Sequence, residues 1–204
     1  MNVKIKICGL KRREDIEAVN EAMPDFCGFI IDCPRSRRNV SKETAAALVK
    51  ELRKEILPVG VFVNAPVEEV AELLNKKIIA MVQLHGQEDE EYIKRLKELT
   101  HRSVIKAFSV KSTGDVQRAA QSSADYVLLD QGSGGTGKAF DWSLVQEMDR
   151  LYFLAGGIGI HNLESAVNTL HPFAVDLSSS VETDGLKDRK KIIEAVNLVR
   201  QLNK

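Results

Sequence analysis

The chain has 204 residues, 44% hydrophobic and 28% charged, and its 29 Lys and Arg residues balance its 29 Asp and Glu residues. This composition is ordinary for a globular protein, and we expect residues 1–204 to form a single domain. A net charge of zero gives no support to binding of nucleic acid or of anionic membranes, which require a basic excess or a basic stripe.

No segment predicts targeting or membrane insertion. The amino-terminal residues lack the apolar core of a signal peptide, and the apolar stretch at 56–63 is too short to span a bilayer. The three cysteines, Cys8, Cys27 and Cys33, have no Cys-x-x-Cys spacing, and one must stay unpaired. We therefore expect a reducing, cytoplasmic location and no membrane partner.

Short apolar runs rich in β-branched residues recur along the chain, as is typical of buried parallel strands. They occupy residues 3–8, 27–31, 58–63, 79–84, 103–108, 125–130, 152–156 and 173–178. Helical patterns lie between them, for example at 43–53 and 68–75. From Asp188 onward, Ile192, Val196, Val199 and Leu202 fall on nearly one helical face.

The strand ends recur at intervals of roughly 24 residues, which suits one strand and one crossover helix. Eight such units in 204 residues predict an α/β fold, a compact (β/α)₈ TIM barrel. The alternative is a doubly wound open sheet, which also alternates but seldom needs eight units in so short a chain.

The stretch VLLDQGSGGTGKAFDW at 127–142 contains two phosphate-binding patterns. Residues 132–138 fit the start of a P-loop, but Ala139 stands where that motif needs a Ser or Thr hydroxyl for Mg²⁺. The same glycines fit a dinucleotide fingerprint, but the acidic residue expected about 20 positions later is missing. The next helix is also predicted to begin only at Trp142. We therefore favour a mobile loop over an active site, directly after Asp130, with a plain surface turn as the alternative.

Seven segments then stand out in chain order: KICGL (6–10), GFIIDCPRSRRNVS (28–41), VGVFVN (59–64), VQLHGQE (82–88), LLDQGSGGTGKAFDW (128–142), LAGGI (154–158) and PFAVDLSSSVE (172–182). Together they closely resemble the phosphoribosylanthranilate isomerase family of tryptophan biosynthesis. The resemblance covers nearly the whole chain and implies a (β/α)₈ barrel, in agreement with the strand spacing.

The resemblance implies an Amadori rearrangement of N-(5-phosphoribosyl)anthranilate to 1-(2-carboxyphenylamino)-1-deoxyribulose 5-phosphate. The partner is then a small-molecule substrate, and no metal or organic cofactor is implied. The chemistry needs a general acid for ring opening and a general base for the proton on C2′. Whether the chain is a monomer or a homodimer stays open.

Cys8 matches the family's general base and Asp130 its general acid, and both end predicted strands, where barrel enzymes carry catalytic groups. Lys6 is expected to be among the residues that bind the substrate. It lies two residues before Cys8 and should point to the same side of the strand, where its charge is expected to lower the pKa of the thiol. Without the resemblance, Cys8 would be interpreted as a small core residue and Asp130 as a helix cap or turn residue.

Arg38 aligns with the family arginine that holds the anthranilate carboxylate, a task for which a guanidinium fork is suited. Arg35 and Arg37 remain competitors, and a solvated basic loop is the alternative. Asp176 is expected to face the ligand and orient the sugar, or only to balance Lys6.

Two segments are expected to bind the phosphate, because the loops after strands seven and eight form the phosphate site of many barrels. Their candidate residues are Gly156, Gly157, Ser178, Ser179 and Ser180. Ser180 stands where the family usually has Gly, which adds a hydroxyl and leaves the local backbone conformation open.

Gln83 and His85 are expected to line the mouth of the barrel, with packing as the alternative. A single histidine without a partner at ligand spacing gives no metal signal. Cys27 and Cys33 are expected to be structural.

Two other hypotheses stay open. Histidine-pathway and dual-substrate phosphoribosyl isomerases carry an aspartate where Cys8 stands, so the thiol argues against them. A non-catalytic sugar-phosphate-binding module would need neither Cys8 nor Asp130.

Overall fold

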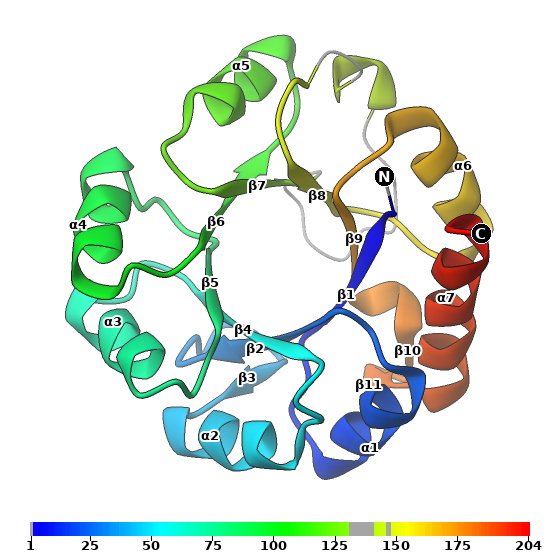
Figure 1. The fold of residues 1–204 in the computed structure, drawn as a ribbon, viewed down its shortest axis with the longest axis horizontal. Coiled ribbons are helices and arrows are strands. Elements are labelled where there is room, and N and C mark those ends of the chain that lie inside the picture. Colours follow the sequence, from blue (N-terminus) through cyan, green and yellow to red (C-terminus); the bar gives the residue numbers. More distant parts are fainter. Residues whose placement is uncertain (1, 131–140, 146–147) are drawn as a thin grey trace.

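The computed structural model describes residues 2–130, 141–145 and 148–204, so the predicted glycine loop at 131–140 lies outside the described residues. Eight parallel strands form a closed barrel with helices around it (Figure 1). The barrel strands are β1 (Lys4–Cys8), β2 (Phe26–Ile31), β4 (Leu57–Phe62), β5 (Met81–Leu84), β6 (Val104–Ser109), β7 (Tyr126–Asp130), β8 (Tyr152–Leu154) and β9 (Ala174–Leu177). Because β1 pairs with both β2 and β9, the eight strands form a closed ring, and the doubly wound alternative is wrong.

The predicted strand ends all fall within two residues of the observed ones. The helices are α1 (Arg13–Ala22), α2 (Lys42–Glu51), α3 (Val67–Asn75), α4 (Glu90–Thr100), α5 (Thr113–Gln121), α6 (Ile160–Leu170) and α7 (Arg189–Leu202). The helix predicted to start at Trp142 does start there, as the short 3₁₀ helix η1 (Trp142–Val145). No helix in the described part of the chain is both long and apolar enough to cross a membrane.

Three short elements lie outside this repeat. The strand β3 (Asn39–Val40) pairs with the end of β2, and a 3₁₀ helix η2 (Ser179–Val181) follows β9. It leads into an antiparallel hairpin of β10 (Glu182–Thr183) and β11 (Leu186–Lys187). These elements all lie near the carboxyl ends of β1, β2 and β9.

The barrel strands are buried on both faces, and their side chains alternate between two cores. Ile5 and Ile7 of β1 belong to the large cluster between strands and helices, whereas Phe26 and Val59 belong to a smaller cluster inside the barrel. Because of this alternation, the side chains of Lys6 and the other even-numbered residues of β1 point into the barrel. The inward positions closest to the strand ends are therefore the ones that can reach a ligand.

The amino-terminal end of the barrel is packed with aromatic rings. The Phe153 ring centroid lies 5.4 Å from that of Phe26 and 5.8 Å from that of Tyr126. Phe173 stacks on Tyr126 with a centroid separation of 4.9 Å. These contacts fill the barrel interior at this end with packed side chains.

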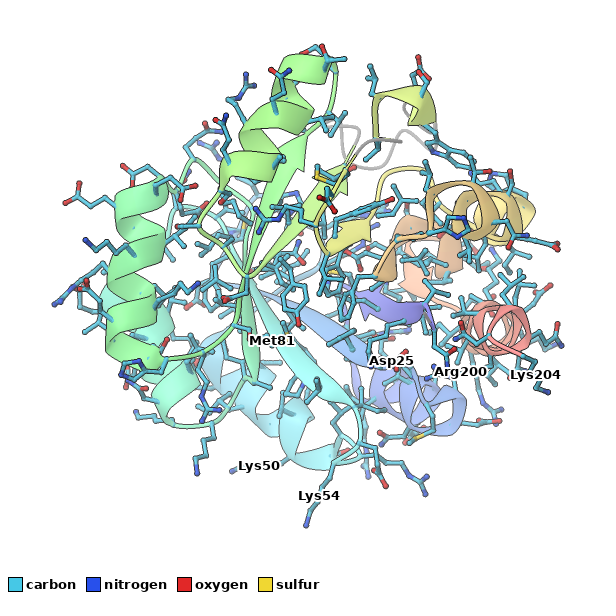
Figure 2. The ribbon with its side chains drawn as sticks, turned by 45° about the horizontal axis from the view of Figure 1, so that its top comes forward. Asp25, Lys50, Lys54, Met81, Arg200 and Lys204 are labelled. Atoms are coloured by element: carbon cyan, nitrogen blue, oxygen red, sulfur yellow. The ribbon has the colours of Figure 1, made fainter. Side chains whose placement is uncertain are left out.

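The last helix is tied to the first strand at the same end. Asp25 Oδ2 accepts a hydrogen bond from the backbone N–H of Ile5 and lies 3.2 Å from Arg200 Nη1 of α7 (Figure 2). The Asn203 side chain exchanges two hydrogen bonds, of 2.8 and 2.9 Å, with the backbone of Val3. These bonds fix α7 against β1, where the barrel closes.

Arg150, just before β8, caps the carboxyl-terminal end of α5 and the turn after it. Its Nη1 donates to the carbonyl oxygens of Ala119, Ala120 and Ser122 at 2.9–3.2 Å, and its Nη2 donates to that of Ala124 at 2.6 Å. A cation there satisfies carbonyls that the helix leaves free and interacts favourably with the helix dipole.

We expect Arg150→Ala to lower the free energy of unfolding by about 2 kcal/mol, because several partly buried carbonyls lose a charged donor. Urea denaturation followed by circular dichroism measures this difference. The matched control is Arg95→Ala, since Arg95 Nη1 lies 3.9 Å from Glu98 on the surface of α4. That variant should stay within about 0.5 kcal/mol of the parent, and equal losses in both variants would contradict the capping role.

Candidate active site

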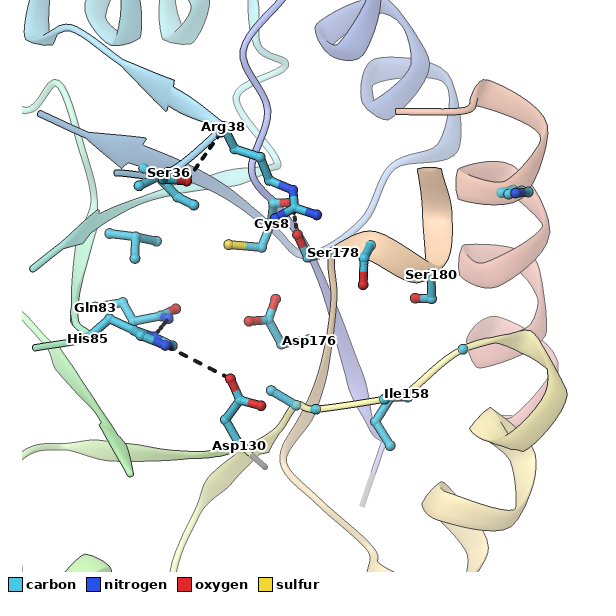
Figure 3. Close-up of a pocket in the computed structure, with 18 of the residues that line it drawn as sticks. Cys8, Ser36, Arg38, Gln83, His85, Asp130, Ile158, Asp176, Ser178 and Ser180 are labelled. Atoms are coloured by element: carbon cyan, nitrogen blue, oxygen red, sulfur yellow. Dashed lines mark hydrogen bonds and ion pairs between the residues drawn. The ribbon is translucent and has the colours of Figure 1, made fainter. Parts of the chain in front are cut away.

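A cavity of about 830 Å³ opens at the carboxyl ends of the barrel strands. Eleven of the twelve residues predicted for the site line it: Cys8, Arg38, Gln83, His85, Asp130, Gly156, Gly157, Asp176, Ser178, Ser179 and Ser180. Figure 3 shows Cys8, Asp130 and Asp176 around one open space, although they come from β1, β7 and β9. The closed barrel thus brings together side chains that are far apart in the sequence.

Lys6, the twelfth, does not line the cavity. It is fully buried inside the barrel, and its Nζ lies 3.0 and 2.9 Å from the two carboxylate oxygens of Asp176. Burial alone would lower the pKa of Lys6, but the Asp176 carboxylate opposes this and raises it above its ordinary value. The period of two in β1 places Lys6 one layer below Cys8, so the expected contact with substrate does not match its position.

Cys8 is almost fully buried at the end of β1, with 7% of its surface exposed. Burial raises the pKa of the Cys8 thiol, while the nearby charge of Lys6 lowers it only in part. The charge of Lys6 acts in the predicted direction, but desolvation has the larger effect and the pKa of Cys8 is raised overall. Among the other cysteines, Cys27 is buried outside the cavity and Cys33 is partly exposed at its wall.

Asp130, His85 and Gln83 form a chain of polar contacts across the cavity (Figure 3). The His85 Nε2 lies 3.9 Å from Asp130 Oδ2, and its Nδ1 lies 2.9 Å from Gln83 Nε2. Desolvation lowers the pKa of His85, although the Asp130 carboxylate acts to raise it. The lowered pKa favours the neutral form of the ring. Since the Gln83 amide donates to Nδ1, the ring proton is assigned to Nε2, which faces Asp130. Gln83 Oε1 is buried and has no hydrogen-bond partner among the described residues.

Of the three clustered arginines, Arg38 lines the cavity, whereas Arg35 and Arg37 do not. Arg38 makes a bidentate contact with Glu182, from Nε to Oε1 at 2.6 Å and from Nη2 to Oε2 at 2.9 Å. Burial would raise the pKa of Glu182, but hydrogen bonds from Arg38 and Lys187 lower it to about 2. No motif in the sequence marked Glu182 or Lys187, although Glu182 lies only two residues after the predicted phosphate-binding serines.

Two loops beside these groups offer backbone donors. Gly156 and Gly157 have φ of 77° and 71°, a conformation that favours glycine, and α6 begins shortly after them. Ser178, Ser179 and Ser180 face them from the loop after β9, and the buried Ser180 Oγ has no partner among the described residues. A helix amino terminus beside backbone amides and the unpartnered Ser180 hydroxyl is suited to an anion.

The described residues contain no cluster of three or more His, Cys, Asp or Glu side chains able to hold a metal ion. The cavity also has wall residues that the sequence analysis did not assign, among them His161 at the start of α6 and Lys191 on α7. They lie beside the loops at 156–157 and 178–180 only in the folded structure, so no local motif could have identified them.

Comparison with known proteins bears on the identity of this site. The family model described as N-(5'phosphoribosyl)anthranilate (PRA) isomerase matches residues 5–198. The N-(5'-phosphoribosyl)anthranilate isomerase of Endomicrobium trichonymphae is 47% identical over 203 residues, which span 98% of this chain and 99% of that protein.

Solved structures agree with this match over the whole fold. The phosphoribosyl anthranilate isomerase of Thermotoga maritima superposes with a TM-score of 0.87 at 35% identity, over 98% of this chain and 99% of that one. A phosphoribosyl anthranilate isomerase in complex with reduced 1-(o-carboxyphenylamino)-1-deoxyribulose 5-phosphate has a TM-score of 0.84 at 33% identity, over the same shares. With family model, relatives and barrel in agreement along nearly its full length, the chain belongs to the N-(5'-phosphoribosyl)anthranilate isomerase family.

Proposed function

We propose that this cavity catalyses the Amadori rearrangement of N-(5-phosphoribosyl)anthranilate by general acid and base catalysis, with Asp130 as the acid and Cys8 as the base. One observation supports this most directly. A thiol and a carboxyl, from β1 and β7, line the same cavity as two loops suited to a phosphate. Family membership supplies the reaction, and the geometry supplies the candidate groups for each proton transfer.

In the first step, protonated Asp130 gives its proton to the furanose oxygen. The C1′–O bond breaks, and the anilino nitrogen forms a C=N bond to C1′, which yields an open-chain protonated Schiff base. In the second step, the Cys8 thiolate removes the proton from C2′, and the electron pair moves into the C1′–C2′ bond to give an enolamine. Loss of the proton on O2′ and gain of one at C1′ then give the ketone. The rearrangement is a set of internal proton transfers, so the proposal calls for no metal or organic cofactor.

The buried pair of Lys6 and Asp176 supports the base. Cys8 is active only as the thiolate, and its burial opposes ionisation. The positive charge of Lys6, held in place by both oxygens of Asp176, favours the thiolate without contacting the substrate. Asp176 reaches the cavity wall from the other side of this pair and is available to a sugar hydroxyl.

The remaining wall residues suit the two anionic ends of the substrate. We assign the phosphate to the backbone of 156–157 and 178–180, and the anthranilate carboxylate to Arg38. Gln83 and His85 also line the cavity, and Gln83 Oε1 has no partner among the described residues, so we assign these two side chains to the ribose chain.

We further propose a cytoplasmic location, since all three cysteines are free thiols in the structure. Monomer and homodimer both remain compatible with the fold. One structural relative, from Thermotoga maritima, is described as a dimeric enzyme from which monomers were generated.

Replacing either proposed proton-transfer group should reduce turnover strongly. Cys8→Ala and Asp130→Asn are each expected to lower kcat by about 100-fold or more, as loss of a general base or acid does. The assay follows the loss of anthranilate fluorescence with freshly prepared substrate. Cys27→Ala and Asp89→Asn are the controls, because Cys27 lies outside the cavity and Asp89 caps α4, a role that Asn also fills. Normal turnover by Cys8→Ala would reject the base assignment.

Removing the proposed carboxylate ligand should act chiefly on substrate binding. Arg38→Ala is expected to raise KM about tenfold or more with a smaller change in kcat, because the contact exists in both ground and transition states. Arg35→Ala is the control, since that side chain is exposed and does not line the cavity. An unchanged KM in Arg38→Ala would show that another group holds the carboxylate.

The ionisation of Cys8 can be followed by the pH dependence of iodoacetamide alkylation, with mass spectrometry to separate Cys8 from Cys33. In the ligand-free protein the midpoint for Cys8 should lie above about 8.5, the value of an ordinary thiol, because burial raises its pKa. Lys6→Met should move the midpoint higher still, since it removes a charge that favours the thiolate. A midpoint near neutral pH, or no shift in Lys6→Met, would contradict this account.

A further inference from the structure

The hairpin of β10 and β11 carries a buried ion pair beside the cavity. Glu182 and Lys187 face each other in antiparallel register, and their side chains are only 4% and 1% exposed. Burying two charges is costly unless their hydrogen-bonding groups are satisfied, so such a pair points to a role beyond stability.

The Glu182 carboxylate is satisfied on both oxygens by cations. Oε1 accepts from Arg38 Nε at 2.6 Å and from Lys187 Nζ at 2.8 Å. Oε2 accepts from Arg38 Nη2 and from Arg37 Nη2, each at 2.9 Å. Three cations around one carboxylate leave two positive charges in excess, which favours a further anion at the cluster.

The contact with Glu182 occupies one edge of the Arg38 guanidinium and leaves the other free. Nε and Nη2 form the edge that Glu182 holds, while Nη1 makes no hydrogen bond to any residue in the described part of the chain. The aliphatic stem of Arg38 crosses Gly9, where a Cβ would lie 2.3 Å from Arg38 Cδ. Arg38 is thus held between the end of β1 and the hairpin, and its second donor edge is available at the cavity wall.

Lys187 connects the hairpin with the rest of the site. Besides Glu182, its Nζ donates to the carbonyl oxygen of Ser178 at 2.9 Å. The Ser178 hydroxyl in turn donates to the carbonyl oxygen of Cys8 at 3.0 Å (Figure 3). The backbone of Glu182 is itself held by Lys191 of α7, at 2.7 Å. The hairpin is therefore hydrogen-bonded to Arg38, to the Ser178 loop and to Lys191 at the cavity wall.

We propose that Glu182 and Lys187 are positioning residues that set the selectivity for a ligand with an ortho carboxylate on its aromatic ring. Glu182 fixes the Arg38 guanidinium by its inner edge, so that the Nη1–Nη2 edge receives the carboxylate in bidentate fashion. Lys187 holds Glu182 in its ionised, correctly oriented state. This inference rests on the proposed function of Arg38 as the carboxylate ligand.

Two ligands separate positioning from a general structural role. The first is reduced 1-(o-carboxyphenylamino)-1-deoxyribulose 5-phosphate, and the second is the same compound with an unsubstituted phenyl ring. Isothermal titration calorimetry gives Kd for both. Glu182→Gln should weaken binding of the carboxylated ligand about tenfold or more but that of the phenyl ligand less than about twofold. Lys187→Met should lower the same selectivity about threefold or more, because it loosens Glu182 without touching the ligand.

The control is Glu51→Gln, an exposed pair partner of Arg13 on the helical surface, which should leave both Kd values unchanged. Thermal denaturation followed by circular dichroism establishes that each variant is folded at the assay temperature. If Glu182→Gln is not folded there, the selectivity of Lys187→Met tests the inference instead. Equal losses for both ligands would reduce the hairpin to a structural role and overturn the inference. Unchanged selectivity in Glu182→Gln and Lys187→Met, with selectivity lost in Arg38→Ala, would overturn the inference alone. Unchanged selectivity in Arg38→Ala would overturn the proposed function of Arg38 together with it.

Discussion

Strand β1 is hydrogen-bonded on both sides, to β2 with Cys8 opposite Gly28 and to β9 with Lys6 opposite Asp176. This double pairing closes the barrel, and it also sets the height of every inward side chain near the ligand. A slip by one residue would turn Cys8 toward the helices and bring an isoleucine to the cavity. Register at the point of closure is thus the constraint on which both the fold and the isomerase site depend.

Charge in the site is arranged by depth. The deepest pair, Lys6 and Asp176, is neutral overall and lies beneath the thiol. The rim carries an excess of positive charge around Glu182 and backbone donors near Gly156. Under the proposed function, a substrate with a carboxylate at one end and a phosphate at the other would meet attraction at both ends, and its uncharged sugar carbons would lie over Cys8 and Asp130. In that proposal, orientation by the two ends would present C2′ to the proposed base and the ring oxygen to the proposed acid.

Much of this could be predicted from the sequence, because the signals are local. Continuous apolar runs followed by turn residues gave the strand ends to within two residues, and strand ends are where barrel enzymes carry their chemistry. The predicted residues other than Lys6 line one cavity. The position of Lys6 below the cavity was not predicted. Alternation along a strand indicates which face a side chain lies on, but it does not indicate how far the cavity extends into the barrel.

The features that escaped prediction depend on contacts between distant segments. Glu182 in the run SSSVE has no local mark that distinguishes a buried carboxylate from a solvated one, and its partner Arg38 lies 144 residues away. The raised pKa of Cys8 likewise follows from burial, which only the closed barrel produces. Sequence patterns identified the groups proposed to carry the chemistry, whereas the residues that support them could be found only from the tertiary structure.

The aromatic packing of Phe26, Tyr126, Phe153 and Phe173 lies at the end of the barrel opposite the cavity. None of these four rings lines the cavity, so the residues that pack this end of the barrel are separate from those of the site. Substitutions that repack these rings can therefore change stability without altering the lining of the cavity. Substitutions in the loops at the carboxyl ends of the strands can change the cavity without altering the ring packing.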